Sequence, residues 1–168
     1  PRMPDTPPTP IDRHAARVLL LDRDDRLLLF RCQEPGSARA FWITPGGGLE
    51  SDETHEQAAR RELREETGLV IEPDALGPCV WHRVHTFPWM DKVYRQHERF
   101  YLLRCDGHDV DPAEHTREEL MVLTESRWWS PRAIDEAAEE HFAPRGIATW
   151  LTKLLREGAP RSPWDVGV

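Results

Sequence analysis

The pattern of apolar and polar positions in the N-terminal part of the chain predicts a hairpin followed by a short strand. Residues 15–22 form a compact apolar run that is typical of a buried strand, and residues 26–31 have the pattern of its returning partner. The charged residues 22–25 lie between them and suit a turn. Residues 41–44 predict a third strand, which leads into a glycine-rich loop at residues 45–48.

A helix is expected directly after this loop. It begins near Thr54, which forms a Ser/Thr-x-x-Glu/Gln capping pattern with Gln57, although Ser51 or Asp52 could serve as the cap instead. Its end is expected at Gly68, because glycine readily adopts the left-handed conformation that closes many helices. The glycine loop and the helix are therefore expected to be immediate neighbours.

The second half of the chain predicts a longer hairpin. Residues 80–87 and 97–104 are rich in aromatic and β-branched side chains, which favour strands, and residues 88–92 form the expected tip. A polar loop is expected over residues 106–119, and a short element over residues 120–123. This part of the chain should therefore add two paired strands to the sheet.

The C-terminal part predicts one more strand and two helices. Residues 127–130 have the pattern of a last strand, and a helix is expected to start at Ser130-Pro131, because proline suits the first helical position. A helical stripe at i, i+3, i+4, i+7 and i+8 is formed by Ile147, Trp150, Leu151, Leu154 and Leu155. Together these elements predict a single α/β domain, with a mixed sheet between helices.

Length and composition support one soluble globular domain. The chain has 168 residues, of which 39% are hydrophobic and 31% are charged. No apolar run approaches the roughly 18 residues that span a bilayer, so no membrane association is expected. No apolar leader is visible in the proline-rich residues 1–12, which we interpret as a flexible arm, and we therefore expect a cytoplasmic protein. Its three cysteines are widely spaced and are expected to be reduced.

The formal net charge of −8 argues against a protein whose main task is to bind a nucleic acid backbone, so no stable nucleic acid partner is expected. The charge does not exclude a small phosphate ester as a ligand. An acidic protein can hold an anionic substrate when metal ions bridge the two.

The expected helix has an acidic face. Glu62, Glu65 and Glu66 are three and four residues apart or adjacent, so their carboxylates share one side of the helix and repel one another. A bound divalent cation would compensate this repulsion, since Mg²⁺ prefers oxygen ligands. The alternative is a solvated acidic face with salt bridges to the arginines of the same helix, Arg60, Arg61 and Arg64.

The spacing of these residues resembles the Nudix box. That pattern is Gly, five residues, Glu, seven residues, then Arg-Glu-apolar-x-Glu-Glu-x-Gly-apolar, and every defined position is matched between Gly47 and Leu69. The chain is thereby identified as a member of the Nudix family, with a hydrolase domain expected over residues 13–157 and a C-terminal tail at residues 158–168. The resemblance implies the Nudix fold, an α/β/α sandwich with a mixed β-sheet.

The resemblance also implies a chemistry. Nudix proteins mostly hydrolyse a nucleoside diphosphate linked to another moiety, using Mg²⁺ or Mn²⁺, so a small nucleotide-type substrate is expected. Carried onto the matching positions, the metal ligands would be Glu62, Glu65, Glu66 and the backbone carbonyl of Gly46, with Glu62 also a candidate base. Arg61 would orient the carboxylates, and Glu53 would support it.

Further site residues are expected outside the box. A distant acidic residue is often recruited as base or ligand, and Glu125 is the first choice, because the strand that follows it should run beside the acidic helix. The alternatives are Glu98, Glu118 and Glu119. Side chains that could stack a base are Trp81, Phe87, Trp89, Tyr94, Trp128 and Trp129. Basic residues that could bind phosphate or a sugar are Arg83, Lys92, Arg95 and Arg99.

Two other functions stay open. An isoprenoid-diphosphate isomerase shares the fold but needs a catalytic cysteine in a specific context, and neither Cys79 nor Cys105 stands in one. A non-catalytic Nudix-fold binding or regulatory domain is the second alternative; such domains often lose box glutamates, and this chain keeps all of them. The sequence does not select one diphosphate substrate, and a homodimer is compatible with a domain of this kind.

Overall fold

The computed structural model describes residues 6–111, 115 and 122–168. The strands are β1 (Ile11–Leu21), β2 (Leu27–Gln33), β3 (Ala40–Ile43), β4 (Gly46–Gly48), β5 (Cys79–Trp89), β6 (Lys92–Arg104), β7 (Leu123–Trp129), β8 (Phe142–Ala143) and β9 (Trp164–Asp165). The helices are α1 (His55–Thr67), a short 3-10 helix (Pro73–Ala75), α3 (Pro131–Glu136) and α4 (Ile147–Glu157).

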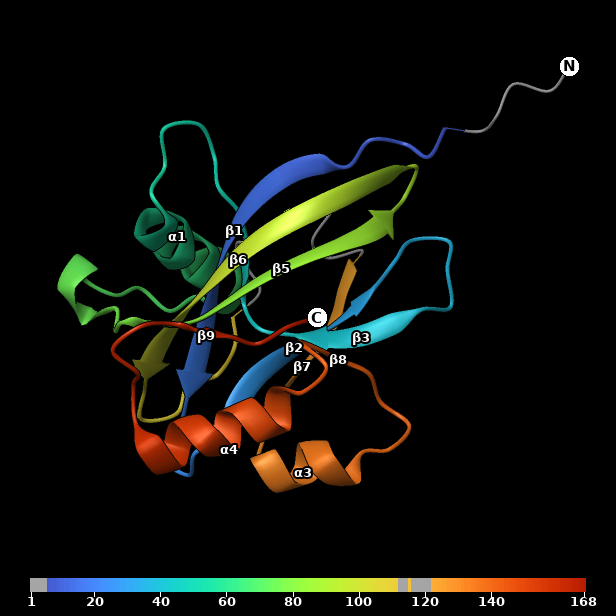
Figure 1. Ribbon diagram of the computed structural model, residues 1–168. Coiled ribbons are helices and arrows are strands. Elements are labelled where there is room, and N and C mark those ends of the chain that lie inside the picture. Colours follow the sequence, from blue (N-terminus) through green and yellow to red (C-terminus); the bar gives the residue numbers. More distant parts are fainter. Residues whose placement is uncertain (1–5, 112–114, 116–121) are drawn as a thin grey trace, which may run out of the picture.

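The strands form one curled, mixed sheet with helices on both faces (Figure 1). The strand order is β8-β3-β2-β1-β6-β5-β9, with β4 paired to β1 and β7 paired to β2. The pairs β1–β6, β3–β8 and β5–β9 are parallel, whereas β1–β2, β2–β3 and β5–β6 are antiparallel. The predicted α/β/α sandwich with a mixed sheet is confirmed.

Strand β1 separates two apolar cores. Val18 and Leu20 pack in the cluster that includes α1, and Leu19 and Leu21 pack in the cluster that includes α4. Successive side chains of a strand point to opposite faces, so a central strand covered on both sides has a continuous apolar run. This explains why residues 15–22 lack the alternation of a half-exposed strand.

The structure lengthens β1 at its start. The predicted strand began at residue 15, but β1 begins at Ile11 and pairs in parallel with β6 from Ile11↔Tyr94 to Leu21↔Arg104. Residues 11–14 are exposed, so they carry no apolar signal, and only their backbone pairing assigns them to the strand.

The predicted glycine loop is in part a strand. Gly46–Gly48 forms β4 and pairs with β1 through Ala16↔Gly47 and Arg17↔Gly46. Only glycine fits here: a Cβ on Gly46, whose φ is 144°, would lie 2.2 Å from the carbonyl oxygen of Ala16. A Cβ on Gly47 would lie 2.5 Å from Oε1 of Glu62. The glycines therefore let β4 lie directly between β1 and the acidic face of α1.

Both predicted ends of the acidic helix are confirmed. Thr54 is the N-cap of α1 and forms a full capping box: its Oγ1 accepts from the Gln57 N–H at 3.1 Å, while Gln57 Oε1 accepts from the Thr54 N–H at 2.9 Å. Gly68 adopts a left-handed conformation with φ 76°, and its N–H donates to the Arg64 carbonyl at 2.8 Å. The helix that carries the carboxylates is thus fixed at each end by local contacts.

The β5–β6 hairpin is confirmed and is longer than predicted. Its strands continue to Trp89 and from Lys92, so the turn shrinks to Met90 and Asp91, with Met90 in the left-handed region at φ 56°. The register places Arg83 opposite Glu98. The long strands carry the pairing well beyond the apolar segments seen in the sequence.

The strand predicted as the last one is not the last. Strand β7 covers the predicted residues 127–129 and pairs with β2, but β8 and β9 follow it. Each has two residues, too few to show a periodic pattern. Strand β9 lies within residues 158–168 and pairs with β5, and Val166 beside it is buried in the core.

The two predicted C-terminal helices are confirmed. Ser130 caps α3, and its Oγ accepts from the Ala133 N–H at 3.1 Å. The apolar stripe of α4 faces the core, with Ile147, Leu151 and Leu154 buried. None of the helices in the described part of the chain is long and apolar enough to cross a membrane. Residues 120 and 121 of the predicted element at residues 120–123 lie outside the described residues, and Leu123 begins β7.

Candidate active site

The acidic face of α1 lies against the glycine strand. Glu62 and Glu66 are one turn apart and are buried, with 8% and 5% of their surface exposed. Glu65 lies at the edge of the same face, and 21% of its side chain is exposed. The sequence therefore placed the three carboxylates correctly on one side of the helix, where two of them point inward.

Arg61 holds the acidic residues together. Its Nε donates to Glu53 Oε2 at 2.7 Å, and its Nη2 donates to Glu53 Oε1 at 2.9 Å and to the Gly48 carbonyl at 3.1 Å. Its Nη1 donates to Glu62 Oε1 at 2.9 Å and to Glu65 Oε2 at 3.3 Å. One guanidinium thus links the helix, the preceding loop and β4.

These contacts supply part of the positive charge that compensates the acidic face. Arg61 holds the pKa of Glu53 below its usual value, and its hydrogen bonds with Glu53 raise its own pKa further. Arg60, by contrast, donates to the Ile71 carbonyl at 3.0 and 3.2 Å. Arg61 therefore offsets part of the repulsion within α1, through its contacts with Glu62 and Glu65.

Glu66 is held by the glycine strand. Its Oε2 accepts from the Gly46 N–H at 3.0 Å, in a buried contact. The carbonyl of Gly46 accepts from Arg17 Nη1 at 3.1 Å, and the Thr44 carbonyl accepts from the same nitrogen at 3.2 Å. The two backbone groups of Gly46 thus connect a carboxylate of α1 with an arginine of β1.

The donor set suits a hard divalent cation. Glu62, Glu65, Glu66 and the Gly46 carbonyl offer oxygen atoms only, which Mg²⁺ and Mn²⁺ prefer. Within residues 6–111, 115 and 122–168, no three His, Cys, Asp or Glu side chains are grouped as they would be around a metal ion. Glu62 and Glu65 share Arg61 Nη1 instead, so the chemistry of the donors fits a metal while their present rotamers favour the arginine.

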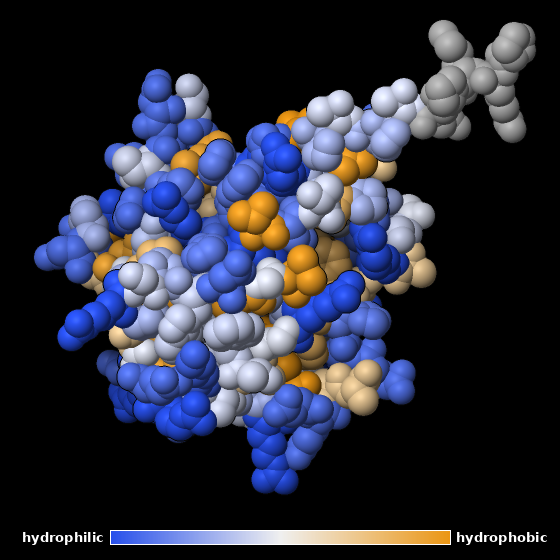
Figure 2. Space-filling view, in the orientation of Figure 1, coloured by the Kyte–Doolittle hydropathy of each residue, from blue (hydrophilic) through white to orange (hydrophobic). Residues whose placement is uncertain are grey.

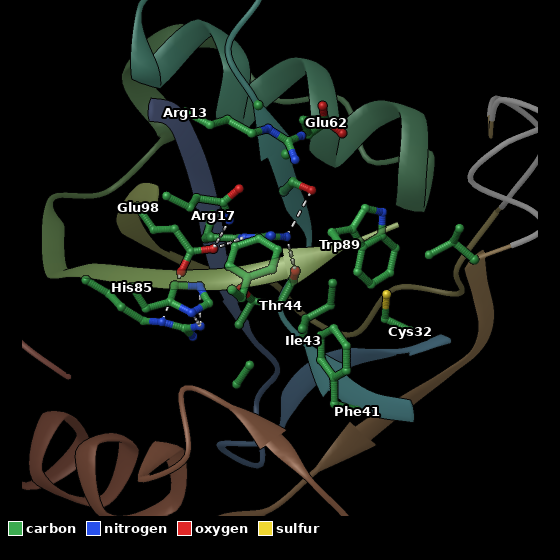
Figure 3. A pocket seen from close by; sticks show the side chains of 18 of the residues that line it. Arg13, Arg17, Cys32, Phe41, Ile43, Thr44, Glu62, His85, Trp89 and Glu98 are labelled. Carbon is green, nitrogen blue, oxygen red and sulfur yellow. Dashed lines mark hydrogen bonds and ion pairs between the residues drawn. The ribbon is translucent and has the colours of Figure 1, made fainter. Parts of the chain in front are cut away.

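A cavity of about 520 Å³ begins at these carboxylates. Strands β1, β5 and β6 line one side and β2, β3 and β8 line the other, because β1 pairs with β2 only at Leu21↔Leu27 and the strands then separate. In Figure 3, Arg13 and Glu62 lie together below α1. Trp89, Phe41 and Cys32 lie on the other side of the view from Glu98 and His85.

The cavity contains a buried ionic group. Glu98 is 4% exposed, and its Oε1 accepts from Arg17 Nε at 3.0 Å and from Gln96 Nε2 at 2.8 Å. Its Oε2 lies 3.4 Å from Arg83 Nε. Burial would raise the pKa of Glu98, but Arg17 and Arg83 together hold it below its usual value. Glu98 is therefore an ionised acceptor.

Two cavity arginines were not predicted from the sequence. Arg17 stands alone as a charge inside an apolar strand, and this interruption was the one available signal. Arg13 lies over Gly48, where a Cβ would approach its Nε to 2.8 Å. Burial and the neighbouring Arg17 lower the pKa of Arg13. Both arginines bring positive charge to a cavity that Glu62 and Glu66 enter.

Glu125 is not brought to this site. Its Oε1 accepts from Arg127 Nη2 at 2.9 Å, and Arg127 lies over the rings of Trp42 and Trp129. Side chains alternate along β7, and its Trp128 packs in the α1 cluster. Glu125 therefore lies on the sheet face opposite α1. Of the alternatives, Glu98 lines the cavity, and residues 118 and 119 lie outside the described residues.

The predicted aromatic and basic residues divide into three groups. Phe87, Trp89 and Arg83 line the cavity. The residues that pack in the two apolar clusters are Trp81, Trp128 and Trp129. Those outside the cavity lining are Lys92, Tyr94, Arg95 and Arg99, and Arg95 pairs with Asp12 at 2.6 Å.

None of the three cysteines has the features of a reactive thiolate. All three are unpaired. Burial raises the pKa of Cys32 to about 11 and also raises the pKa of Cys79 and Cys105. A catalytic cysteine usually has a lowered pKa, so this geometry disfavours the isomerase alternative. Fold and site together define an α/β protein with an oxygen-donor cluster at the end of an aromatic-lined cavity.

Comparison with known proteins names this class. The NUDIX domain profile matches residues 12–151, so the chain belongs to the Nudix family. It is 30% identical over 130 residues to the RNA pyrophosphohydrolase of Erythrobacter litoralis, which covers 71% of this chain and 76% of that protein. The family predicted from the box is confirmed.

Solved structures confirm the fold. A MutT protein from Methanosarcina mazei Go1 gives a TM-score of 0.64 at 19% identity, covering 88% of this chain and 96% of that one. A bifunctional NMN adenylyltransferase/ADP ribose pyrophosphatase from Francisella tularensis, complexed with AMP and a manganese ion, gives a TM-score of 0.60 at 22% identity. That match covers 90% of this chain and 43% of the other.

Proposed function

We propose that the protein is a metal-dependent hydrolase of a diphosphate linkage in a small nucleotide-type substrate. The observation that carries this proposal is the position of Glu62 and Glu66. Both lie buried at one end of a cavity of about 520 Å³, against strand β4, whose glycines have no side chains. Ligand pockets of roughly 300–1,000 Å³ bury most of a small molecule, so a nucleotide fits this space. The RNA pyrophosphohydrolase and ADP ribose pyrophosphatase names of relatives support the reaction class.

Mg²⁺ or Mn²⁺ would be held by Glu62, Glu65, Glu66 and the Gly46 carbonyl. A metal held there would supply positive charge to the diphosphate oxygens and would lower the pKa of the attacking water. Glu62 is the candidate base for that water. Arg61 positions the carboxylates, and Glu53 fixes Arg61 through two hydrogen bonds of 2.7 and 2.9 Å.

The reaction is a hydrolysis at phosphorus. The water oxygen forms a bond to one phosphorus as the bridging P–O bond breaks, and the leaving phosphate takes the electron pair. The products are two phosphorylated molecules, or a monophosphate and pyrophosphate. Arg13 and Arg17 face the cavity and would bind the non-bridging oxygens, because guanidinium groups match phosphate geometry.

The surface, the net charge and the cysteines each give an indication of the partners and of the cellular compartment of the protein. Hydrophobic side chains are scattered among hydrophilic ones on the face that Figure 2 shows, which gives no support to the dimer that the sequence left open. The net charge of −8 favours a small substrate over a long nucleic acid. The three unpaired cysteines suit a reducing compartment such as the cytoplasm.

A turnover screen tests the proposal. The purified protein is assayed with Mg²⁺ and with Mn²⁺ against nucleoside triphosphates, ADP-sugars, dinucleoside polyphosphates, coenzymes and triphosphorylated RNA. Glu65→Gln and Glu66→Gln are expected to lower kcat on the best substrate by about 10–1,000-fold, because each removes charge from the metal site. Turnover of none of these compounds, or full turnover in both variants, would reject the hydrolase.

A matched control separates charge loss from general damage. Glu139 is exposed in the segment between α3 and β8, far along the chain from the box, so Glu139→Gln makes the same chemical change outside the site. It is expected to retain the turnover of the unchanged protein.

A further inference from the structure

Three buried polar atoms that line the cavity lack hydrogen-bond partners in the described part of the chain. They are Gln96 Oε1, Glu98 Oε2 and Arg83 Nε, and the last two lie 3.4 Å apart as an ion pair without a hydrogen bond between them. Gln96 and Glu98 are 3% and 4% exposed, so bulk water does not satisfy them freely. Buried polar groups are nearly always hydrogen-bonded, and a set of such atoms without hydrogen bonds in one cavity indicates that a ligand completes it. None of the three belongs to the Nudix box.

The hairpin register explains how these atoms come together. Arg83 lies opposite Glu98, and His85 lies opposite Gln96. Side chains alternate between faces along a strand, so these four residues share one face of β5–β6. Phe87 follows on the same face and also lines the cavity. The hairpin therefore presents two polar pairs followed by aromatic surface.

Arg83, His85, Gln96 and Glu98 form the floor of the cavity. The charges of these residues and of Arg17 determine which of their atoms donate and which accept hydrogen bonds. Arg17 and Arg83 keep Glu98 ionised, so its oxygens only accept. The Gln96 amide must turn its Nε2 toward Glu98, since its oxygen would be repelled, and Oε1 is left to accept from elsewhere. Burial and Arg83 lower the pKa of His85 to about 4, so the imidazole is neutral and accepts from Arg83 at 2.6 Å. The floor thus offers two acceptor oxygens and one N–H donor.

We propose that this floor binds a guanine-type base, the 2-amino-6-oxopurine edge, and thereby selects guanine nucleotides. The inference rests on the proposed hydrolase function, because the base would belong to the substrate whose diphosphate lies at Glu62 and Glu66. Guanine has two neighbouring N–H donors and a carbonyl oxygen on one edge. The donors match Gln96 Oε1 and Glu98 Oε2, and the carbonyl matches Arg83.

Other bases match the floor less well. Adenine and cytosine each present one amino donor beside an acceptor nitrogen, and uracil flanks one N–H with two carbonyl oxygens. Each would place at least one acceptor against the Gln96 and Glu98 oxygens. Phe87, Trp89 and Phe41 supply aromatic surface for stacking, which every base accepts. Selectivity therefore comes from the polar floor and affinity from the aromatic walls.

The floor is joined to the carboxylates by a continuous chain of hydrogen bonds. Glu98 Oε1 binds Arg17 Nε at 3.0 Å, and Arg17 Nη1 binds the Gly46 carbonyl at 3.1 Å. The Gly46 N–H binds Glu66 at 3.0 Å. The base-binding and metal-binding ends of the cavity are thus held in fixed relation, as one nucleotide requires.

The first experiment compares GTP, ITP and ATP as substrates of the unchanged protein. ITP differs from GTP only in lacking the 2-amino group. We expect kcat/KM for GTP to exceed that for ITP and for ATP by about 10–100-fold, because loss of one donor leaves a buried acceptor unpaired. Equal kcat/KM for the three nucleotides, or a preference for ATP, overturns the proposal.

Gln96→Met tests the floor itself. The variant keeps the length of the side chain and removes the acceptor oxygen, so the GTP/ITP ratio of kcat/KM is expected to fall by about tenfold. A general loss of activity would cancel in this ratio. Thr86→Ala is the control, because Thr86 is exposed on the same hairpin, and it should keep the ratio unchanged. An unchanged ratio in Gln96→Met overturns the role of Gln96.

Binding without turnover separates this inference from the hydrolase function. Calorimetry with GMP, IMP and AMP in metal-free buffer reports base recognition alone, and GMP is expected to bind at least about tenfold more tightly than IMP. Selective GMP binding without hydrolysis of any compound in the turnover screen would reject the hydrolase and keep the base site. Hydrolysis together with equal binding of GMP and IMP would keep the hydrolase function and reject the guanine site.

Discussion

A single guanidinium, that of Arg61, orders the acidic residues of the site. It contacts Glu53, Glu62 and Glu65 at 2.7 to 3.3 Å and reaches the Gly48 carbonyl as well. Its planar, forked geometry allows several parallel hydrogen bonds, which a lysine cannot reproduce. The forked shape of the Arg61 guanidinium is therefore more important for ordering the carboxylates than its charge.

Arg61→Lys tests this difference. The variant keeps the positive charge but loses the fork, so Glu62 and Glu65 should be less well ordered and metal affinity should fall by about 10–100-fold. The measurement is Mn²⁺ binding by calorimetry, together with kcat on the best substrate.

Arg132→Lys is the matched control, because Arg132 is exposed on α3 and pairs with Glu136 of the same helix at 2.7 Å. Mn²⁺ affinity that is equal in Arg61→Lys and in the unchanged protein would contradict the ordering role of Arg61.

His85 links the folding stability to pH. The pKa of its imidazole falls from 6.5 to about 4 on folding, chiefly through burial and then through Arg83. Between these values the unfolded chain binds a proton that the folded protein does not. This contribution to the free energy of unfolding is complete above about pH 6.5 and is lost as the pH falls toward 4.

Urea unfolding at several pH values between 7 and 4 measures this loss, with 6.5 and about 4 as its expected limits. In His85→Asn the dependence on pH should be weaker, because the titrating group is absent. His82→Asn, at an exposed position on the same strand, should keep the original dependence. Identical pH profiles in both variants would show that His85 makes no such contribution.

The site residues differ in how well their positions could be predicted from the sequence. Glu62, Glu65, Glu66 and Arg61 belong to one helix, where spacing alone fixes the side on which each lies. Gln96 and Arg17 show no such spacing, because they meet through a parallel strand pair between distant segments. Sequence therefore predicted the cluster within α1 and named Glu98 and Arg83 as candidate site residues, but it gave no sign of Gln96, His85 or the floor that they form together.

Among the elements, helix α1 is the one whose two ends are fixed by contacts within its own sequence. Its capping box and its glycine C-cap are local features, which is why both were predicted. A two-residue strand such as β8 or β9 has no periodicity and exists only because a neighbouring strand pairs with it. Elements with a local sequence pattern were thus found from sequence, and the two-residue strands β8 and β9 were not.

Thr54→Ala should destabilise the protein by about 1 kcal/mol, because it leaves N–H groups at the start of α1 without their cap. The free energy of unfolding from urea titration measures this change. Thr149→Ala, at an exposed position in α4, is the control and should alter stability much less. A loss in Thr54→Ala no larger than that in Thr149→Ala would show that the capping box is not important for stability.

At the scale of the whole molecule, the cavity is a product of the sheet's curvature. Strand β1 pairs with β2 at one end and with β4 at the other, so the sheet separates into two walls. The α/β/α class could be predicted because a strand buried on both faces needs helices on both sides. The separation of β1 from β2 leaves no sequence pattern, so the cavity between them could not be predicted.

The parallel pairing of β1 with β6 also has a consequence for how the chain is made. Asp12 and Arg95, which pair across these strands, are 83 positions apart. During synthesis β1 therefore leaves the ribosome long before its main partner exists, with its apolar residues only partly covered by β2 and β4. Contacts of such long range form slowly, and the exposed intermediate is prone to aggregate. The nascent chain is thus most in need of a chaperone in the interval before residue 104 has been added.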